Sequence, residues 1–226
     1  MIATGVAVVA AVAQYTVPAM VPALERVPGR ELLPGEWWRL FTPVLVQTLG
    51  WFQVVANLLS LGVVGAVPEL LLGRVRWAVL LVAGTVGGQT AAYLSGEPGG
   101  GDSIAICGLA GGALVALMLG PSPGTRFGAF VVVSYVAALA GWGFGLAVAG
   151  AACLCVAVLQ GVLLRVEAVR AQRVLVAVAM VCALAMAGTG GMHGVSLVSG
   201  MVAAGAMAVP VPGSRVGSPR VGAEVQ

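Results

Sequence analysis

One serine and the single histidine of this chain have the residue types and settings that nucleophilic catalysis requires. Ser103 follows a glycine-rich stretch, residues 99–101, and opens an apolar run, while His193 opens the last apolar run. A serine hydroxyl is a weak nucleophile until a neighbouring base takes its proton, and histidine, with a pKa near neutrality, is the usual base. The pair predicts a Ser–His dyad, provided that the fold brings the two side chains together.

Asn57 is a third polar residue that could take part in the predicted catalysis. It lies a few residues inside an apolar run, at an expected depth similar to that of Ser103. Its amide can donate a hydrogen bond to the oxyanion of a tetrahedral intermediate, assisted by backbone N–H groups near Ser103. Other roles stay open, because serine is a common helix N-cap and a membrane asparagine often bonds a neighbouring helix.

The composition predicts that these residues act inside a membrane. Hydrophobic residues make up 60% of the chain and charged residues 8%, and the mean hydropathy is +1.05. Too little polar surface exists to cover a water-soluble fold of 226 residues. Since lipid leaves no partner for exposed backbone groups, the apolar runs are expected to be helices. The predicted fold class is all-α, a polytopic membrane protein.

Several other functions are excluded by what the sequence lacks. The net charge of +3 includes no basic stripe, which argues against nucleic acid as a partner. No GxxxxGK[ST] or HExxH motif and no pair of intramembrane carboxylates occurs, so no nucleotide, metal or other cofactor is expected. The four cysteines all lie in apolar runs, where thiols usually behave as small hydrophobic groups.

Eight membrane spans position the candidate residues. A stretch without charge, residues 127–164, is too long for one span, and we predict a hairpin near Gly141–Gly145. No basic residue precedes the first apolar run, so it is expected to be a retained helix rather than a signal peptide. Residues 1–209 form the predicted membrane domain, and residues 210–226 a disordered cytoplasmic tail. The predicted spans are 2–22, 52–72, 77–96, 103–120, 127–146, 147–164, 173–190 and 193–209.

The arginines orient this topology. Basic residues concentrate in short cytoplasmic loops, and eight spans with both termini in the cytoplasm place eight of the eleven arginines there. Three spans then separate the fourth from the eighth, so Ser103 and His193 both start a span at the outer side. A single helix over residues 127–164 would place them on opposite sides. The exceptions, Arg26, Arg30 and Arg39, belong to an outer loop, residues 23–51, expected to be ordered at the interface by Trp37 and Trp38.

Four stretches of this sequence resemble motifs of the rhomboid family, in the family's order and spacing. They are residues 35–42 (GEWWRLFT), Asn57 followed by Glu69 and Gly73, residues 101–108 (GDSIAICG), and His193 followed by Gly200. The resemblance covers roughly residues 31–120 and 188–206. It implies a rhomboid-like helical bundle, with a six-helix core and two inserted helices before the helix that carries the histidine.

The resemblance also implies an activity, that of an intramembrane serine protease. Ser103 would be the nucleophile, His193 the general base and acid, and Asn57 an oxyanion donor. Gln53 stands where the family has a histidine near the oxyanion site, and its amide can still donate. The implied partners are transmembrane protein substrates and membrane lipid.

Two further positions depart from the family pattern. Ile104 stands where a glycine follows the nucleophile, and a β-branched side chain there is expected to crowd the scissile carbonyl. Ser196 replaces a glycine in the last helix, and we expect it to preserve the packing of that helix on the fourth span.

Three functions follow, in order of support. The first is a serine endopeptidase that cleaves transmembrane segments at the outer face of the cell membrane. The second, favoured by Ile104, is a catalytically inactive rhomboid-like protein that binds transmembrane helices of client proteins. The third, a small-solute transporter, is distant because the chain shows neither an inverted repeat nor a charged site at the midplane.

Overall fold

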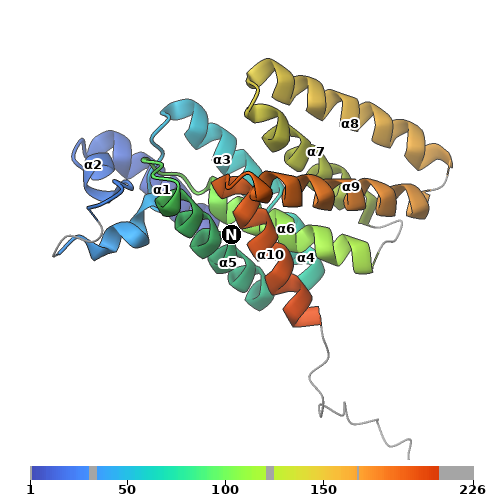
Figure 1. Cartoon of the computed structure of the whole chain (residues 1–226), viewed down its shortest axis with the longest axis horizontal. Coiled ribbons are helices and arrows are strands. Elements are labelled where there is room, and N and C mark those ends of the chain that lie inside the picture. Colours follow the sequence, from blue (N-terminus) through green and yellow to red (C-terminus); the bar gives the residue numbers. More distant parts are fainter. Residues whose placement is uncertain (1, 31–34, 121–124, 167, 209–226) are drawn as a thin grey trace, which may run out of the picture.

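The computed structural model describes residues 2–30, 35–120, 125–166 and 168–208 (Figure 1). These residues form helices, and their one strand-like feature is an isolated bridge between Arg26 and Gly99. The predicted tail, residues 210–226, lies outside the described residues. The α-helices are α1 (Ile2–Thr16), α2 (Met20–Leu24), α3 (Trp51–Val63), α4 (Ala66–Leu72), α5 (Arg74–Leu94), α6 (Ser103–Leu119), α7 (Arg126–Trp142), α8 (Leu146–Val166), α9 (Ala168–Gly188) and α10 (Met192–Ala208).

The predicted all-α membrane bundle is confirmed by the helices. Three described segments are long and apolar enough to cross a membrane: Trp51–Leu72, Arg74–Leu94 and Val169–Gly188. Five shorter apolar helices correspond to the other predicted spans: Thr4–Thr16, Ser103–Leu119, Arg126–Trp142, Leu146–Val162 and Met192–Ala208. The shorter helices include α6, whose 17 residues span roughly 25 Å at about 1.5 Å per residue. Since the hydrocarbon core is about 30 Å thick, the end of α6 that carries Ser103 can lie below the membrane surface.

The prediction of one helix over residues 2–22 is wrong. The helix α1 ends at Thr16, and the chain turns before α2 begins at Met20. Pro18 explains the break, because proline cannot donate a helical hydrogen bond and disfavours helical geometry at the preceding residue.

The predicted hairpin between the fifth and sixth spans is confirmed. The helix α7 ends at Trp142 and α8 begins at Leu146, with Gly145 at a φ of 110°. This left-handed geometry favours glycine. Gly141 also lets the two helices approach closely, since a Cβ on residue 141 would lie 2.7 Å from the Cα of Ala149.

The centre of the molecule is α6, which packs against α5 and α10 (Figure 1). Glycines allow these three backbones to touch. A Cβ on Gly84 of α5 or on Gly200 of α10 would overlap the backbone of Gly108 in α6. Small residues at such crossings are the usual basis of helix packing in membranes. At the outer edge of the bundle, α8 packs mainly on α7 and α9.

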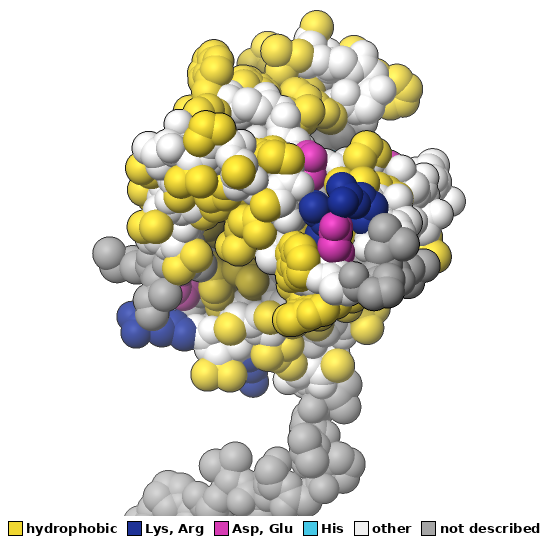
Figure 2. Space-filling view, turned by 90° about the vertical axis from the view of Figure 1, so that its left-hand side faces the viewer, with side chains coloured by type: hydrophobic (Ala, Val, Ile, Leu, Met, Phe, Trp, Pro, Cys, Tyr) yellow, Lys and Arg dark blue, Asp and Glu magenta, His cyan; other side chains and the backbone are white. Residues whose placement is uncertain are grey.

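The surface is apolar where lipid is expected. Figure 2 shows hydrophobic side chains across much of one face and the charged side chains in a few small groups. Leu70, Leu94 and Phe144 are each more than four-fifths exposed. A water-soluble protein rarely exposes so much contiguous apolar surface, so the chain is a membrane protein.

The loop between α2 and α3 is ordered by Arg39. This buried side chain donates to Oε2 of Glu36 at 2.6 Å and to the carbonyl oxygens of Glu25 at 2.7 Å and Pro22 at 3.0 Å. Trp38 donates from Nε1 to the carbonyl of Ala23 at 3.1 Å. Both side chains therefore fix the loop against the end of α2.

Candidate active site

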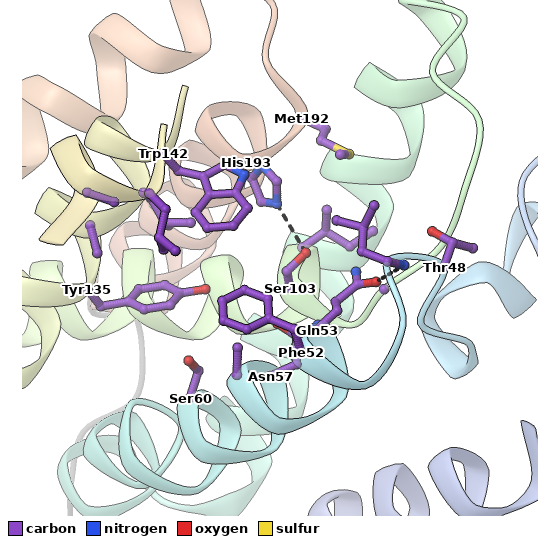
Figure 3. Close-up of a pocket in the computed structure, with 18 of the residues that line it drawn as sticks. Thr48, Phe52, Gln53, Asn57, Ser60, Ser103, Tyr135, Trp142, Met192 and His193 are labelled. Atoms are coloured by element: carbon purple, nitrogen blue, oxygen red, sulfur yellow. Dashed lines mark hydrogen bonds between the residues drawn. The ribbon is translucent and has the colours of Figure 1, made fainter. Parts of the chain in front are cut away.

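The structure brings Ser103 and His193 together. Ser103 is the first residue of α6 and His193 is the second residue of α10, two helices that begin at the same end of the bundle. Oγ of Ser103 lies 3.1 Å from Nε2 of His193, within hydrogen-bonding distance (Figure 3). The sequence predicted this arrangement, because three spans between the fourth and the eighth make both of these helices start on the same side of the membrane. The catalytic roles themselves stay predictions.

The loop before Ser103 is held by the segment that precedes α3. Thr48 accepts a hydrogen bond at Oγ1 from the backbone N–H of Gly100 and donates from Oγ1 to its carbonyl, at 3.0 and 3.2 Å. The N–H of Gly101 donates to the carbonyl of Pro43 at 2.9 Å. A Cβ on Gly100 would lie 2.6 Å from that same carbonyl oxygen. Glycine at position 100 therefore lets the two loops pack directly on each other and fixes the start of α6.

A cavity of about 510 Å³ lies beside the Ser–His pair. Its walls come from α3, the loop before α6, α7, α8 and the start of α10, and most of the lining is apolar. Phe52 of α3 and Trp142 of α7 stack across it, with ring centroids 6.0 Å apart and ring planes 10° apart (Figure 3). The size and lining suit an apolar segment held beside a few polar groups.

Asn57 lies in the cavity wall and is buried. Its Nδ2 donates to Oε1 of Gln47 at 2.8 Å, so the amide takes part in a hydrogen bond within the protein. The partner comes from the loop before α3 rather than from a neighbouring helix. The Asn57 side chain also hydrogen-bonds to Asp102, so the amide has polar partners both in this loop and at the residue before Ser103.

Gln53 also lines the cavity, but both ends of its amide bond the loops. Nε2 donates to the carbonyl of Gly100 at 3.0 Å, and Oε1 accepts from the N–H of Leu49 at 2.8 Å. In this arrangement Gln53 anchors the loop before Ser103.

Ile104 packs between helices and also borders the cavity, so the expectation that it crowds the scissile carbonyl stays a prediction. Its side chain is buried between helices, and a Cβ on Gly88 of α5 would lie 2.7 Å from Cβ of Ile104. The missing side chain at position 88 thus makes room for the isoleucine, which still borders the cavity at one edge.

The expected close packing of α10 on α6 is present with Ser196 at this buried position. Its hydroxyl also donates to the carbonyl of Gly84 at 2.9 Å and so ties α10 to α5. Gly111 and Gly200 contribute to the contact of α10 with α6, since a Cβ on either would overlap the backbone of the partner helix.

Sequence reasoning missed several polar residues of the site. Tyr135 of α7 lines the cavity (Figure 3). Its hydroxyl lies 3.7 Å from Sγ of Cys107. Its signal was a hydroxyl-bearing aromatic in an otherwise apolar span. Gln47 and Asp102 are buried beside Asn57, and their proximity joins positions too far apart for local spacing to reveal.

Two charged groups lie near the dyad, outside the spans. Arg26 is buried in the cavity wall, where it donates to the side-chain oxygen of Gln89 and to the carbonyl of Glu97. Burial lowers the pKa of Arg26, and Tyr93 and Glu97 oppose this shift. Burial raises the pKa of Asp102 above its ordinary value, and the hydrogen bond from Gln47 opposes that shift.

No group of three or more His, Cys, Asp or Glu side chains gathers anywhere in the described part of the chain. The four cysteines are free, and Cys153 lines the cavity from α8.

Comparison with known proteins identifies the family. The model of the family described as Rhomboid domain matches residues 34–146, half of the chain. The chain therefore belongs to the rhomboid family. The matched region contains Gln53, Asn57 and Ser103 but ends before His193.

One curated relative is similar to part of the chain. Rhomboid protease GluP of Bacillus subtilis (strain 168) is 36% identical over 81 residues, which are 35% of this chain and 16% of that protein. The chain thus covers only a small part of this relative's length. No solved structure matches.

Proposed function

We propose that this protein is an intramembrane serine endopeptidase that cleaves transmembrane segments of other membrane proteins. The observation that carries the proposal is the 3.1 Å contact between Oγ of Ser103 and Nε2 of His193 at the edge of a largely apolar cavity. Membership of the rhomboid family and the similarity to a rhomboid protease support the same reaction class.

The proposed mechanism uses the neutral form of His193 with Nε2 unprotonated. As Oγ of Ser103 attacks the scissile carbonyl carbon, Nε2 takes the hydroxyl proton, and it later gives a proton to the leaving amine. Water then hydrolyses the acyl-enzyme with His193 again as the base. The first N–H groups of α6 have no intrahelical partner, and they stabilise the oxyanion with help from the Asn57 amide, which turns from its loop partners toward the substrate.

We also propose that both termini are cytoplasmic and that the site opens toward the outer face of the cell membrane. The arginine distribution supports this orientation. The substrates would then be membrane proteins whose helices reach the cavity from lipid or from the outer interface.

Labelling with a fluorophosphonate probe in detergent tests the enzyme directly. Wild-type protein should label covalently, while Ser103→Ala and His193→Ala should not, because the probe reacts with an activated serine. Ser95→Ala is the matched control, since Ser95 is exposed at the end of α5 and should not affect labelling. Asn57→Ala should cleave a model transmembrane substrate about 10²-fold more slowly, the effect of losing one oxyanion donor.

The competing function is an inactive member of the family that binds transmembrane helices. The observation that favours it is Ile104 at the position after the serine. Absence of labelling and of cleavage in well-folded wild-type protein would exclude the peptidase and favour this alternative.

A further inference from the structure

Four polar side chains form a buried chain of contacts beside the cavity. Nε2 of Gln47 donates to Oδ1 of Asp102 at 2.7 Å, and Oε1 of Gln47 accepts from Nδ2 of Asn57 at 2.8 Å. Gln14 of α1 completes the group, and all four side chains are at most 8% exposed. The chain of contacts thus joins α1, the loop before α3, α3 itself and the residue that precedes Ser103.

The backbone of Gln47 is clamped from both sides. Oε1 of Gln14 accepts from its N–H at 2.8 Å, and Nε2 of Gln14 donates to its carbonyl at 3.4 Å. The position of Gln47 is therefore fixed by α1, and the remaining freedom is the orientation of its side-chain amide.

An ionised Asp102 carboxylate fixes which end of each neighbouring amide donates and which accepts. The Asp102 carboxylate only accepts hydrogen bonds, so Gln47 must present its amide nitrogen to it and its amide oxygen to Asn57. Asn57 must in turn present its nitrogen. Without the carboxylate, the orientation of the Gln47 and Asn57 amides would not be fixed. Each amide could rotate by 180° about its terminal bond, which exchanges the positions of its oxygen and nitrogen, and the two could still hydrogen-bond to each other.

The orientation of Asn57 matters for the chemistry next to it. An amide N–H stabilises a developing oxyanion, whereas an amide oxygen at the same place repels it. Asp102 does not line the cavity, so its negative charge lies behind Gln47 and Asn57. A buried carboxylate is costly, and Oδ2 of Asp102 has no hydrogen-bond partner in the described part of the chain.

We propose that Asp102 is a positioning residue that acts through Gln47 to hold the Asn57 amide with its nitrogen toward the oxyanion. This inference rests on the proposed peptidase function. Asp102 touches no substrate, and its effect reaches the reaction only through Asn57.

Exchanging the carboxylate and the amide between positions 47 and 102 tests whether a carboxylate orients the Asn57 amide. Asp102→Asn removes the fixed acceptor, and we expect kcat to fall about tenfold with KM unchanged, a smaller loss than removal of the donor. Gln47→Glu places two carboxylates face to face and should lower kcat similarly. The double variant Gln47→Glu/Asp102→Asn reverses the pair. The amide at position 102 then donates to the carboxylate at position 47, which still accepts from Asn57. Its kcat should return to within about twofold of wild type.

Two further comparisons separate positioning from a structural effect. In an Asn57→Ala background, Asp102→Asn should lower kcat no further, because both changes act on the same donor. Glu69→Gln is the matched loss of a carboxylate. It breaks a surface contact of 3.4 Å with Arg74 in another part of the bundle and should leave kcat unchanged. Thermal unfolding in detergent checks that each variant is folded. Should Asp102→Asn alone fail to fold, Gln47→Glu and the double variant carry the test.

The possible outcomes are distinct. If the wild type cleaves substrate but the double variant is no better than either single variant, or Asp102→Asn still costs tenfold without Asn57, the positioning role is wrong and the peptidase stands. If the folded wild type neither labels nor cleaves, the proposed function fails, and the positioning role fails with it.

Discussion

At the residue scale, the environment of a side chain decides its role more than its place in a motif. Ile104 follows the candidate nucleophile and borders the cavity, and Gly88 of α5 provides room for its side chain on the other side. Its side chain is 2% exposed and serves as packing between α5 and α6. The departure from the family pattern is therefore matched by a glycine on the facing helix.

Ile104→Gly should consequently reduce stability without raising activity. Removing a buried isoleucine leaves a void beside Gly88, and large-to-small changes of this kind cost about 2–5 kcal/mol. We expect a lower melting temperature in detergent and a kcat no higher than that of the wild type. A clear rise in kcat would instead show that the isoleucine obstructs the scissile bond.

At the element scale, the dyad depends on how closely α10 approaches α6. Gly200 lies against the backbone of Gly108, about two helical turns along α10 from His193. His193 is carried by the same helix, so any change in the spacing of the two helices changes its distance from Ser103.

Gly200→Ala should therefore impair catalysis from a distance. A Cβ at this position would overlap the Gly108 carbonyl, which forces α10 away from α6 and stretches the contact between His193 and Ser103. We expect lower thermal stability and at least tenfold slower labelling, since a small misplacement of a base is costly. Gly205→Ala on the same helix is the matched control, because a Cβ there meets nothing within 4 Å. Equal behaviour of the two variants would contradict this account.

The helix α8 affects the site in a different way, as a wall of the cavity. Gly150 and Cys153 of this helix line it, although α8 lies at the outer edge of the bundle. The family match ends at residue 146, where α8 begins, so this wall of the cavity lies outside the matched region.

Gly150→Leu should narrow the cavity without disturbing the fold. A Cβ on residue 150 meets nothing within 4 Å, so a larger side chain can extend into the space that a substrate would use. We expect a lower kcat/KM for substrates with bulky residues near the scissile bond and little change for small ones, measured on a matched substrate series. Gly161→Leu, on the same helix and away from the cavity, is the control. A uniform loss over the whole series would indicate damage to the dyad rather than a narrower wall.

At the scale of the whole molecule, the sequence predicts the order of the helices well and the loop contacts poorly. Apolar run length places the helices, the glycine-rich turn places the hairpin, and parity places Ser103 and His193 at one end. The contact between Gln47 and Asp102 was not predicted, because it joins two loops that have no periodicity and lie 55 positions apart. The break after Thr16 was also missed, since apolar run length took precedence over Pro18.

The orientation of the bundle in the membrane is a property of the whole molecule, and arginines on the short loops set it. In a background in which all four cysteines are replaced, Ser95→Cys and Thr189→Cys probe the exposed loops that precede α6 and α10. A membrane-impermeant thiol reagent should label both in intact cells. Arg74→Cys, an exposed position at the start of α5, should label only after the cells are permeabilised.

Each pattern of labelling has a definite meaning for the proposed orientation. Labelling of Arg74→Cys alone in intact cells would reverse the orientation and place the site toward the cytoplasm, with the dyad preserved. Labelling of Ser95→Cys and Thr189→Cys from opposite sides would separate the two catalytic ends. The 3.1 Å contact between Ser103 and His193 requires α6 and α10 to begin at the same face, so this second result would remove the dyad and the peptidase with it.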